Sequence, residues 1–136
     1  MQMNPYLSFN GECEAAFKFY EKCLGAKITF MMTFDGTPMA DQAPPGWGKK
    51  ILHATLDVGG QTLQGSDNPP GQYEEPKGMN VMLSLTDPLE AERIFNALSE
   101  NGKVQLPLQQ TFWALRFGMV VDRFGTPWMI NCEQSQ

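Results

Sequence analysis

The chain has 136 residues, a net charge of −5 and an isoelectric point near 4.8. This length fits one domain, or two small repeats that share a core. The acidic balance argues against a nucleic-acid partner, which would require a clustered basic face. No apolar run approaches the ~20 residues that span a bilayer, and the N-terminus lacks a signal-peptide pattern. We therefore expect a cytoplasmic protein that binds neither nucleic acid nor membrane.

The three cysteines, Cys13, Cys23 and Cys132, have neither a disulfide-framework spacing nor a metal-site spacing. We expect reduced thiols that pack as small hydrophobic side chains. The sequence has no Gly-rich phosphate loop, no nucleophile elbow and no Cys-x-x-Cys motif. The absence of these motifs argues against the common phosphate-binding proteins, serine hydrolases and dithiol oxidoreductases.

The first half of the chain predicts one strand, one helix and three more strands. The predicted strands cover 5–9, 27–34, 51–58 and 61–66, and the helix covers 12–24. Gly25 stands where a left-handed helix cap belongs, and Gly59-Gly60 predicts a hairpin turn. In strand 51–58, alternation predicts one face with Leu52, Ala54, Leu56 and Val58 and another with Ile51, His53, Thr55 and Asp57.

Two loops of the first half stand out. Residues 35–50 form a long Pro- and Gly-rich loop of the kind that is often functional or mobile. In this loop, Trp47 would anchor a lid, contact the partner in a dimer, or fill a buried space beneath the loop. Residues 69–78 are predicted to be a linker between two modules at about 1–68 and 79–136. We expect the loop carboxylates to be solvated charges: Asp41, Asp67, Glu74 and Glu75.

The same order of elements repeats in the second half. The predicted strands cover 80–85, 104–108, 115–121 and 128–132. Asp87 is predicted to cap a helix whose first residue is Pro88, with Glu90 completing a capping box. Asn101-Gly102 is predicted to end that helix. The pattern indicates an α+β fold of two βαβββ modules, which would form a curved, cup-shaped mixed sheet with helices outside and a pocket inside.

Five segments of this chain resemble the vicinal-oxygen-chelate superfamily, and within it the PhnB-like branch. They are PYL at 5–7, EAAFKFY at 14–20, LGA at 24–26, TFWA at 111–114 and DRFGTPWMIN at 122–131. The superfamily includes glyoxalase I, bleomycin-resistance proteins and extradiol dioxygenases. The resemblance implies paired βαβββ modules in a single domain over 1–136, and a homodimer.

The resemblance also implies metal-ligand positions on the first and last strand of each module. In this chain those positions carry Gln64, Asn80 and Met129, and the first strand offers only Pro5, Tyr6 or Leu7. Hard or borderline divalent cations favour carboxylate or imidazole ligands over neutral amides and thioethers. We therefore expect no metal cofactor. The alternative is a divalent metal that His53 and Glu133 bind at an unusual place.

His53 is the only histidine and lies on the polar side of its predicted strand. It would act as a general base or anion contact if that side lines the pocket, and as a structural or solvated residue otherwise. Trp113 and Arg116 would together suit a flat or anionic ligand, or an interface. Trp128 is expected in the core.

Three functional hypotheses follow. The first is a metal-free protein that binds an apolar or aromatic small molecule. The ligand would lie against Trp113, Phe117 and Met129. The expected polar contacts come from Arg116, Gln64 and His53, and Asn80 also belongs to the expected ligand-binding residues. The second is a metal-dependent lyase or isomerase of glyoxalase type. The third is a dimeric interaction scaffold. Methyltransferase chemistry is discounted, because the sequence has no cofactor motif for it.

Overall fold

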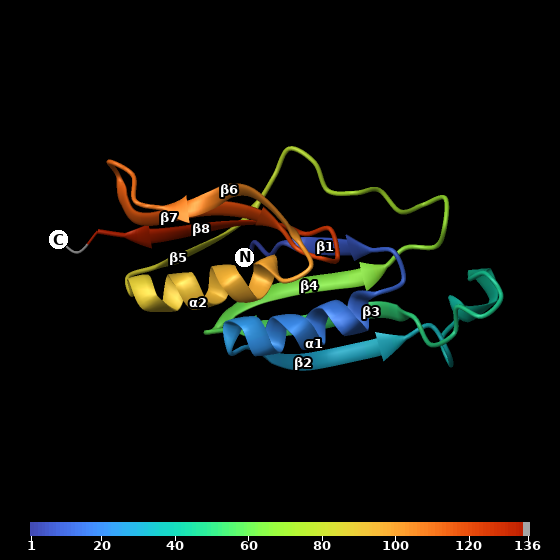
Figure 1. Cartoon of the computed structure of the whole chain (residues 1–136). Helices are drawn as coiled ribbons and strands as arrows, with labels where there is room; N and C mark the ends of the chain where they lie inside the picture. The colour runs from blue at the N-terminus through green and yellow to red at the C-terminus, as the bar shows by residue number, and fades with distance from the viewer. Residues whose placement is uncertain (135–136) are drawn as a thin grey trace. The chain divides into compact units, whose positions relative to one another are not determined.

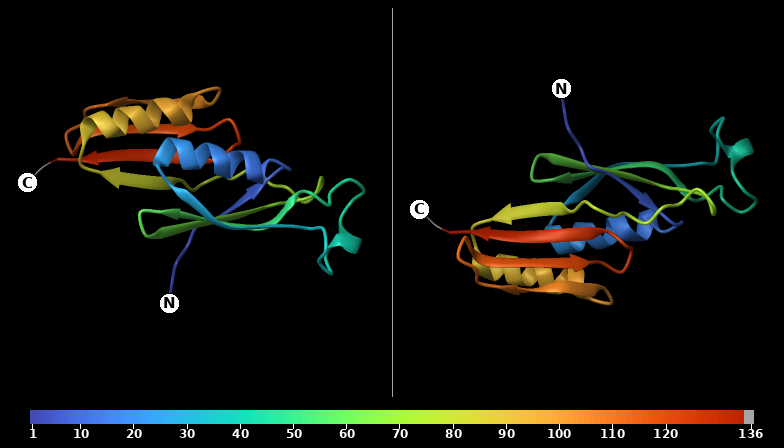
Figure 2. Two further views of the ribbon diagram at one scale, coloured as in Figure 1. Left: turned by 90° about the horizontal axis from the view of Figure 1, so that it is seen from below. Right: turned by 90° about the horizontal axis from the view of Figure 1, so that it is seen from above.

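The computed structural model describes residues 1–134 (Figure 1). The chain divides into two compact units, Met1–Glu75 and Pro76–Gln136. Each unit is a βαβββ module with its own four-stranded sheet. In both modules the helix lies across one face of its own sheet, as the views in Figure 2 show. The predicted α+β fold class is confirmed.

The first module contains every element that the sequence predicts. Its elements are β1 (Tyr6–Phe9), α1 (Cys13–Leu24), β2 (Lys27–Thr33), β3 (Ile51–Val58) and β4 (Gln61–Asp67), with a short 3-10 helix, η1 (Ala40–Gln42), in the long loop. The strand order is β1-β4-β3-β2. β1 runs parallel to β4, whereas the other neighbours are antiparallel.

The second module repeats this topology. Its elements are β5 (Val81–Leu85), α2 (Pro88–Ser99), β6 (Lys103–Gln109), β7 (Ala114–Val121) and β8 (Pro127–Glu133). The strand order is β5-β8-β7-β6, and β5 runs parallel to β8. No helix among residues 1–134 is long and apolar enough to cross a membrane.

Each helix buries an apolar stripe against its sheet. The buried residues of α1 are Cys13, Ala16, Phe17, Tyr20 and Cys23, and those of α2 are Ala91, Ile94, Phe95 and Leu98. A glycine lies opposite each stripe. A Cβ at Gly65 of β4 would come within 3.2 Å of Phe17, and a Cβ at Gly118 of β7 within 2.8 Å of Phe95. The glycines therefore allow both helices to pack closely on their strands.

Asp67 at the end of β4 is buried, with 3% of its surface exposed. Its Oδ1 accepts a hydrogen bond from the Cys13 backbone N–H at 2.9 Å, and its Oδ2 accepts one from the Ile51 N–H at 2.8 Å. The expectation that Asp67 is a solvated loop charge is wrong. Its carboxylate satisfies an orphan donor in the first turn of α1 and ties that turn to the start of β3.

The predicted alternation of β3 is also wrong at its first residues. Ile51 is 1% exposed and belongs to the core together with Ala54 and Leu56, not to the face of His53. The pairing of β3 with β2 shifts register between Met32 and Thr33, close to this point. A register shift of this kind moves a side chain from one face to the other.

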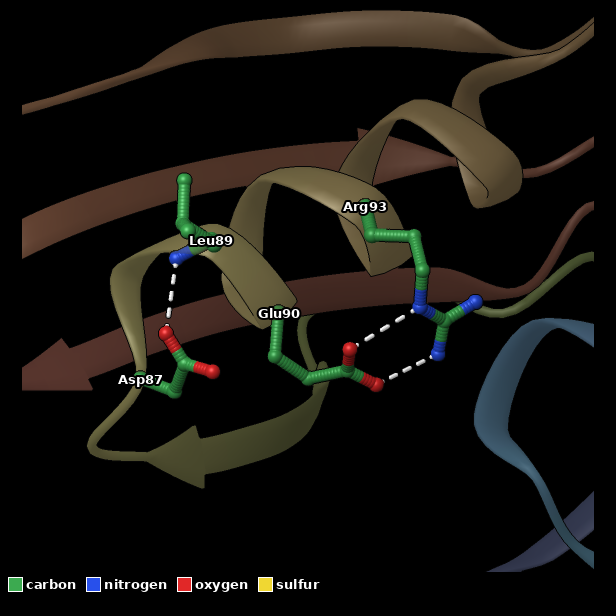
Figure 3. Close-up of polar contacts among 4 residues, drawn as sticks. All are labelled: Asp87, Leu89, Glu90 and Arg93. Atoms are coloured by element: carbon green, nitrogen blue, oxygen red, sulfur yellow. Dashed lines mark hydrogen bonds and ion pairs between the residues drawn. The ribbon is translucent and has the colours of Figure 1, made fainter.

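The start of α2 matches the prediction in part (Figure 3). Asp87 Oδ1 accepts a hydrogen bond from Leu89 N–H at 3.0 Å, and Pro88 is the first helical residue. Glu90 does not act as the predicted capping-box partner. Its carboxylate pairs with Arg93, at 2.9 Å from Nε to Oε2, and this hydrogen bond lowers the pKa of Glu90. The helix is followed by Asn101 in the left-handed region, with φ of 58°.

The turn between β7 and β8 is built around the buried carboxylate of Asp122. Its Oδ1 accepts hydrogen bonds from Phe124 N–H at 2.8 Å and Thr126 N–H at 3.1 Å. Its Oδ2 accepts one from Trp128 Nε1 at 2.8 Å. Trp128 is 1% exposed and lies in the core, as expected. The DRFGTPW segment is therefore a structural turn that fixes where β8 begins.

Candidate functional site

The face of the first sheet that points away from α1 carries polar and aromatic side chains. Residues in register across the four strands form one row on this face: Tyr6 of β1, Gln64 of β4, Thr55 of β3 and Phe30 of β2. Tyr6 is 50% exposed and Phe30 is 47% exposed. We call this row, together with His53, the polar row.

His53 is the centre of the polar row. Its ring stacks on Tyr6 at a centroid distance of 5.7 Å and an interplanar angle of 22°. Phe30 lies on β2 with its ring centroid 5.8 Å from that of His53. Because β4 separates β1 from β3, the long phenol side chain of Tyr6 reaches across β4 to meet the imidazole. Three rings from three strands thus form a partly exposed aromatic cluster.

A chain of hydrogen bonds runs through this cluster. The Tyr6 hydroxyl lies 3.1 Å from His53 Nδ1, and the Thr55 hydroxyl lies 3.5 Å from His53 Nε2. Gln64 Nε2 donates to Thr55 Oγ1 at 3.5 Å. If Thr55 donates to Nε2, Nδ1–H donates to Tyr6, and the phenol proton is left for a ligand. In the other tautomer Tyr6 donates to Nδ1, and its oxygen lone pairs face outward.

Sequence reasoning identified His53 and Gln64 and noted Thr55 beside His53, but it missed Tyr6 and Phe30 as their partners. Alternation alone indicates which residues of one strand share a face. The contact between Tyr6 and His53 also requires the strand order β1-β4-β3 and its register. The aromatic residues in predicted strands 5–9 and 27–34 were the available signal.

The corresponding row of the second sheet is apolar. Met82 of β5, Met129 of β8, Met119 of β7 and Leu106 of β6 are in register. We call these four residues the methionine row. Asn80, the residue before β5, is exposed. The side chains of the methionine row suit apolar contact.

Trp113 and Phe117 lie together in the second module. Their rings meet edge to face at 5.4 Å, and Phe112 lies 4.7 Å from Trp113. Phe117 pairs with Asn131, whose Oδ1 is buried and has no hydrogen-bond partner among residues 1–134. Trp113 and Phe117 therefore contact each other, and their role in holding a ligand stays a prediction.

Arg116 is not beside Trp113 as predicted. On β7, Arg116 pairs with the buried Cys132 of β8, and its Nε lies 3.1 Å from Glu92 Oε1 on α2. Arg116 therefore lies on the helix side of the sheet, opposite Phe117. The register shift between Ala114 and Arg116 contributes to this placement. The guanidinium and the aromatic pair do not form one binding surface.

The donor chemistry does not fit a divalent metal. Among residues 1–134 no group of three or more His, Cys, Asp or Glu side chains is placed to hold a metal ion. The superfamily ligand positions carry the amides of Gln64 and Asn80 and the thioether of Met129. These neutral groups are weak ligands for hard or borderline cations.

Cys13, Cys23 and Cys132 are buried thiols that form no disulfide. Burial raises the pKa of the Cys13 thiol, and the charges of Asp67 and Glu14 raise it further. Burial also raises the pKa of Cys132, against the opposing charge of Arg116. Thiols in this state are poor nucleophiles. The placement agrees with the expected packing role.

Comparisons with known proteins agree with the fold. Protein YjdN of Escherichia coli K12 is 35% identical over an alignment of 144 positions, which covers 100% of this chain and 98% of YjdN. The crystal structure of protein PA1353 from Pseudomonas aeruginosa is 48% identical with a TM-score of 0.89, covering 99% of each chain. A PhnB protein from Bacillus cereus, described as a putative 3-demethylubiquinone-9 3-methyltransferase, has a TM-score of 0.79. At 22% identity over 99% of this chain and 100% of the other, it supports the fold alone.

The family assignment rests on the extent of the match. The family model of the Glyoxalase/Bleomycin resistance protein/Dioxygenase superfamily matches residues 2–130. That range includes both modules up to the middle of β8. The chain belongs to the glyoxalase/bleomycin resistance protein/dioxygenase superfamily, with a PhnB protein among its structural relatives.

Proposed function

We propose that this protein binds a small planar organic molecule on the polar row of its first sheet, and that it does so without a resident catalytic metal. Members of its superfamily bind small molecules. The single observation that carries the proposal is the stacked and hydrogen-bonded pair of Tyr6 and His53, flanked by Phe30.

The row supplies the contacts that a flat ligand requires. Tyr6 and Phe30 are about half exposed, so their apolar surface is available to a ring. Aromatic pairs contribute roughly 0.5–1.5 kcal/mol beyond the area that they bury. Between these rings, Gln64 and Thr55 offer amide and hydroxyl groups. The orientation of the hydrogen-bond chain decides whether the ligand meets a phenol donor or a phenol acceptor.

The metal-free part of the proposal rests on ligand chemistry. The amides and thioether at the superfamily positions would hold a divalent cation weakly, and His53 is the only imidazole. A metal-dependent lyase or isomerase remains the alternative. It would need ligands outside those positions, with His53 as the first candidate.

The test of binding is a ligand-observed NMR screen of catechol, 4-hydroxybenzoate, nicotinate and indole. We expect at least one compound to bind, and His53→Ala to weaken that compound about tenfold, the loss of roughly 1.4 kcal/mol. Leu89→Ala is the control, because it shortens a side chain of α2 that is 75% exposed and lies outside the polar row. Unchanged affinity in His53→Ala would sink the proposed site.

The test of metal dependence uses untagged protein, since a polyhistidine tag would bind metal itself. We expect near-zero occupancy after incubation with Zn, Ni, Mn, Fe or Co followed by gel filtration. Ligand affinity should also survive EDTA treatment. Occupancy near one metal per protomer, lost in His53→Ala, would overturn the metal-free reading and support an enzyme.

Assembly and location remain predictions from sequence and resemblance. We expect a homodimer, which sedimentation equilibrium would test, and a cytoplasmic location, which cell fractionation would test. A dimer without any ligand-dependent rise in melting temperature would favour the interaction scaffold.

A further inference from the structure

A cavity of about 240 Å³ lies within the first module, between the long loop and the segment after β4. Its apolar wall includes Phe34, Met39 and Leu52, and its polar wall includes Gln42, Asn68 and Gln72. None of the residues that line it belongs to the polar row. At ~30 Å³ per water molecule, it has room for on the order of eight waters.

Backbone hydrogen bonds hold the loop wall in place. Phe34 N–H donates to Lys50 carbonyl at 3.1 Å, and Asp35 N–H donates to Gly48 carbonyl at 2.9 Å, which closes the base of the loop. The Lys50 ammonium donates to Gly11 carbonyl at 2.9 Å and lies 5.8 Å from the centre of the Trp47 ring. The loop is thereby fastened to the residues that precede α1.

The opposite wall is ordered in the same way. Asn68 N–H donates to Phe9 carbonyl at 2.8 Å, and Gln72 N–H donates to Pro69 carbonyl at 2.9 Å. Two walls with fixed backbones make a cavity that exists before any ligand arrives. Preformed sites of this kind lose less conformational entropy on binding.

The lining offers no positive charge to an anion. No lysine or arginine is among the described residues that border the cavity. Asp67 also borders it, but both of its carboxylate oxygens already accept backbone N–H groups of Cys13 and Ile51. The amides of Gln42, Asn68 and Gln72 can donate and accept hydrogen bonds toward a neutral polar group. Phe34 and Met39 offer a ring and a thioether, which make favourable contacts with an aromatic ring.

We propose that this loop cavity is a second binding site, for a compact uncharged molecule that carries one aromatic ring and one amide or hydroxyl group. The site is independent of the polar row, because the two share no residue. The volume lies below the ~300–1,000 Å³ that is typical of pockets for drug-sized molecules, which favours a compact ligand.

The test compares benzamide with benzoate, which have the same ring but differ in charge. We expect benzamide to shift backbone and side-chain amide NMR signals of Gln42, Asn68 and Gln72 saturably, with a Kd on the order of 1 mM. Benzoate should leave those signals unchanged. The absence of a shift with benzamide up to about 20 mM, or equal shifts with benzoate, would overturn the proposal.

Two variants test the location. Ala43→Phe places a ring in the cavity and should weaken benzamide at least tenfold, whereas Ala15→Phe makes the same change on the exposed side of α1 and should have no effect. Gln42→Ala, at an exposed position, should weaken benzamide about threefold without risk to folding. Unchanged affinity in the folded Gln42→Ala and Ala43→Phe variants would refute the site. His53→Ala should leave the benzamide-induced shifts of Gln42, Asn68 and Gln72 unchanged, which separates this site from the polar row.

Discussion

The two modules are alike on the helix side of their sheets and different on the other side. Each module has a buried aspartate that accepts backbone N–H groups, Asp67 or Asp122. Each also has a glycine beneath an aromatic ring of its helix. On the other side, the polar row of the first module takes the place that the methionine row takes in the second. The residues in register are Tyr6, Gln64, Thr55 and Phe30 in the first and Met82, Met129, Met119 and Leu106 in the second.

This difference separates the requirements of folding from those of binding. The helix side must satisfy buried donors and fit a helix closely, so a buried aspartate and a glycine serve these needs in both modules, although they lie at β4 in the first and at β7 in the second. The other side has no such packing requirement within a module, so its residues can differ. The polar row offers hydrogen-bonding side chains, whereas the methionine row offers three thioethers and a leucine. The predictions below test this division, from the largest expected effect to the smallest.

Removal of the buried carboxylates should have the largest effect. Asp122→Ala leaves three donors without their acceptor, including the Trp128 indole, and Asp67→Ala leaves two. At roughly 1–3 kcal/mol per buried unsatisfied group, we expect losses of about 4 and about 3 kcal/mol. Urea unfolding followed by circular dichroism would measure both.

The matched control is Asp57→Ala, which removes an exposed aspartate that accepts Gly60 N–H at 3.1 Å. We expect a loss below about 1 kcal/mol, because water replaces the lost acceptor. Equal losses for all three variants would show that burial is not the cause.

Replacement of the glycines beneath the helices should cause the next largest loss of stability. A Cβ at Gly118 would lie 2.8 Å from Phe95 and 2.9 Å from the backbone of Leu108. A Cβ at Gly65 would have its nearest contact at 3.0 Å, to the carbonyl of Leu7. We expect Gly118→Ala to cost about 2–3 kcal/mol and Gly65→Ala about 1–2 kcal/mol, by overpacking. The reverse order in urea unfolding would contradict this ranking.

The sequence predicted elements better than contacts. Local signals such as Gly25, Gly59-Gly60 and Asp87 mark where elements begin and end, and all eight strands and both helices lie close to their predicted bounds. Asp67 was misjudged because its partner Cys13 is 54 residues away in the chain. Such long-range partners depend on strand order and register, which local patterns do not encode. The same limit hid the contact of Tyr6 with His53.

The buried thiols predict a loss of stability at alkaline pH. The folded chain keeps the Cys13 proton above pH 9.0, the ordinary pKa of the group, whereas the unfolded chain releases it. Stability is therefore fully present below that pH and falls as the pH rises above it. We expect Cys13 to contribute a loss of about 1.4 kcal/mol between pH 8 and pH 10.

This contribution is isolated by comparing the wild type with Cys13→Ala in urea unfolding at the two pH values. The variant should lose less stability over this interval. Cys132→Ala should show a smaller difference, because Arg116 opposes the rise in the pKa of Cys132. Parallel loss in the wild type and Cys13→Ala would exclude the thiol as the source.

The smallest effect should come from Arg116, and it tests the division between the two sides most directly. The ion pair with Glu92 is partly exposed, so Arg116→Met should cost less than about 1 kcal/mol in urea unfolding. Because Arg116 lies on the helix side, the same variant should leave the affinity of any ligand found in the NMR screen unchanged. Trp113→Ala is the companion variant, since it removes the ring that meets Phe117 at the other side of this sheet. If Arg116→Met weakened an anionic ligand, the guanidinium would contact ligand after all, and the separation of packing from binding would fail in the second module.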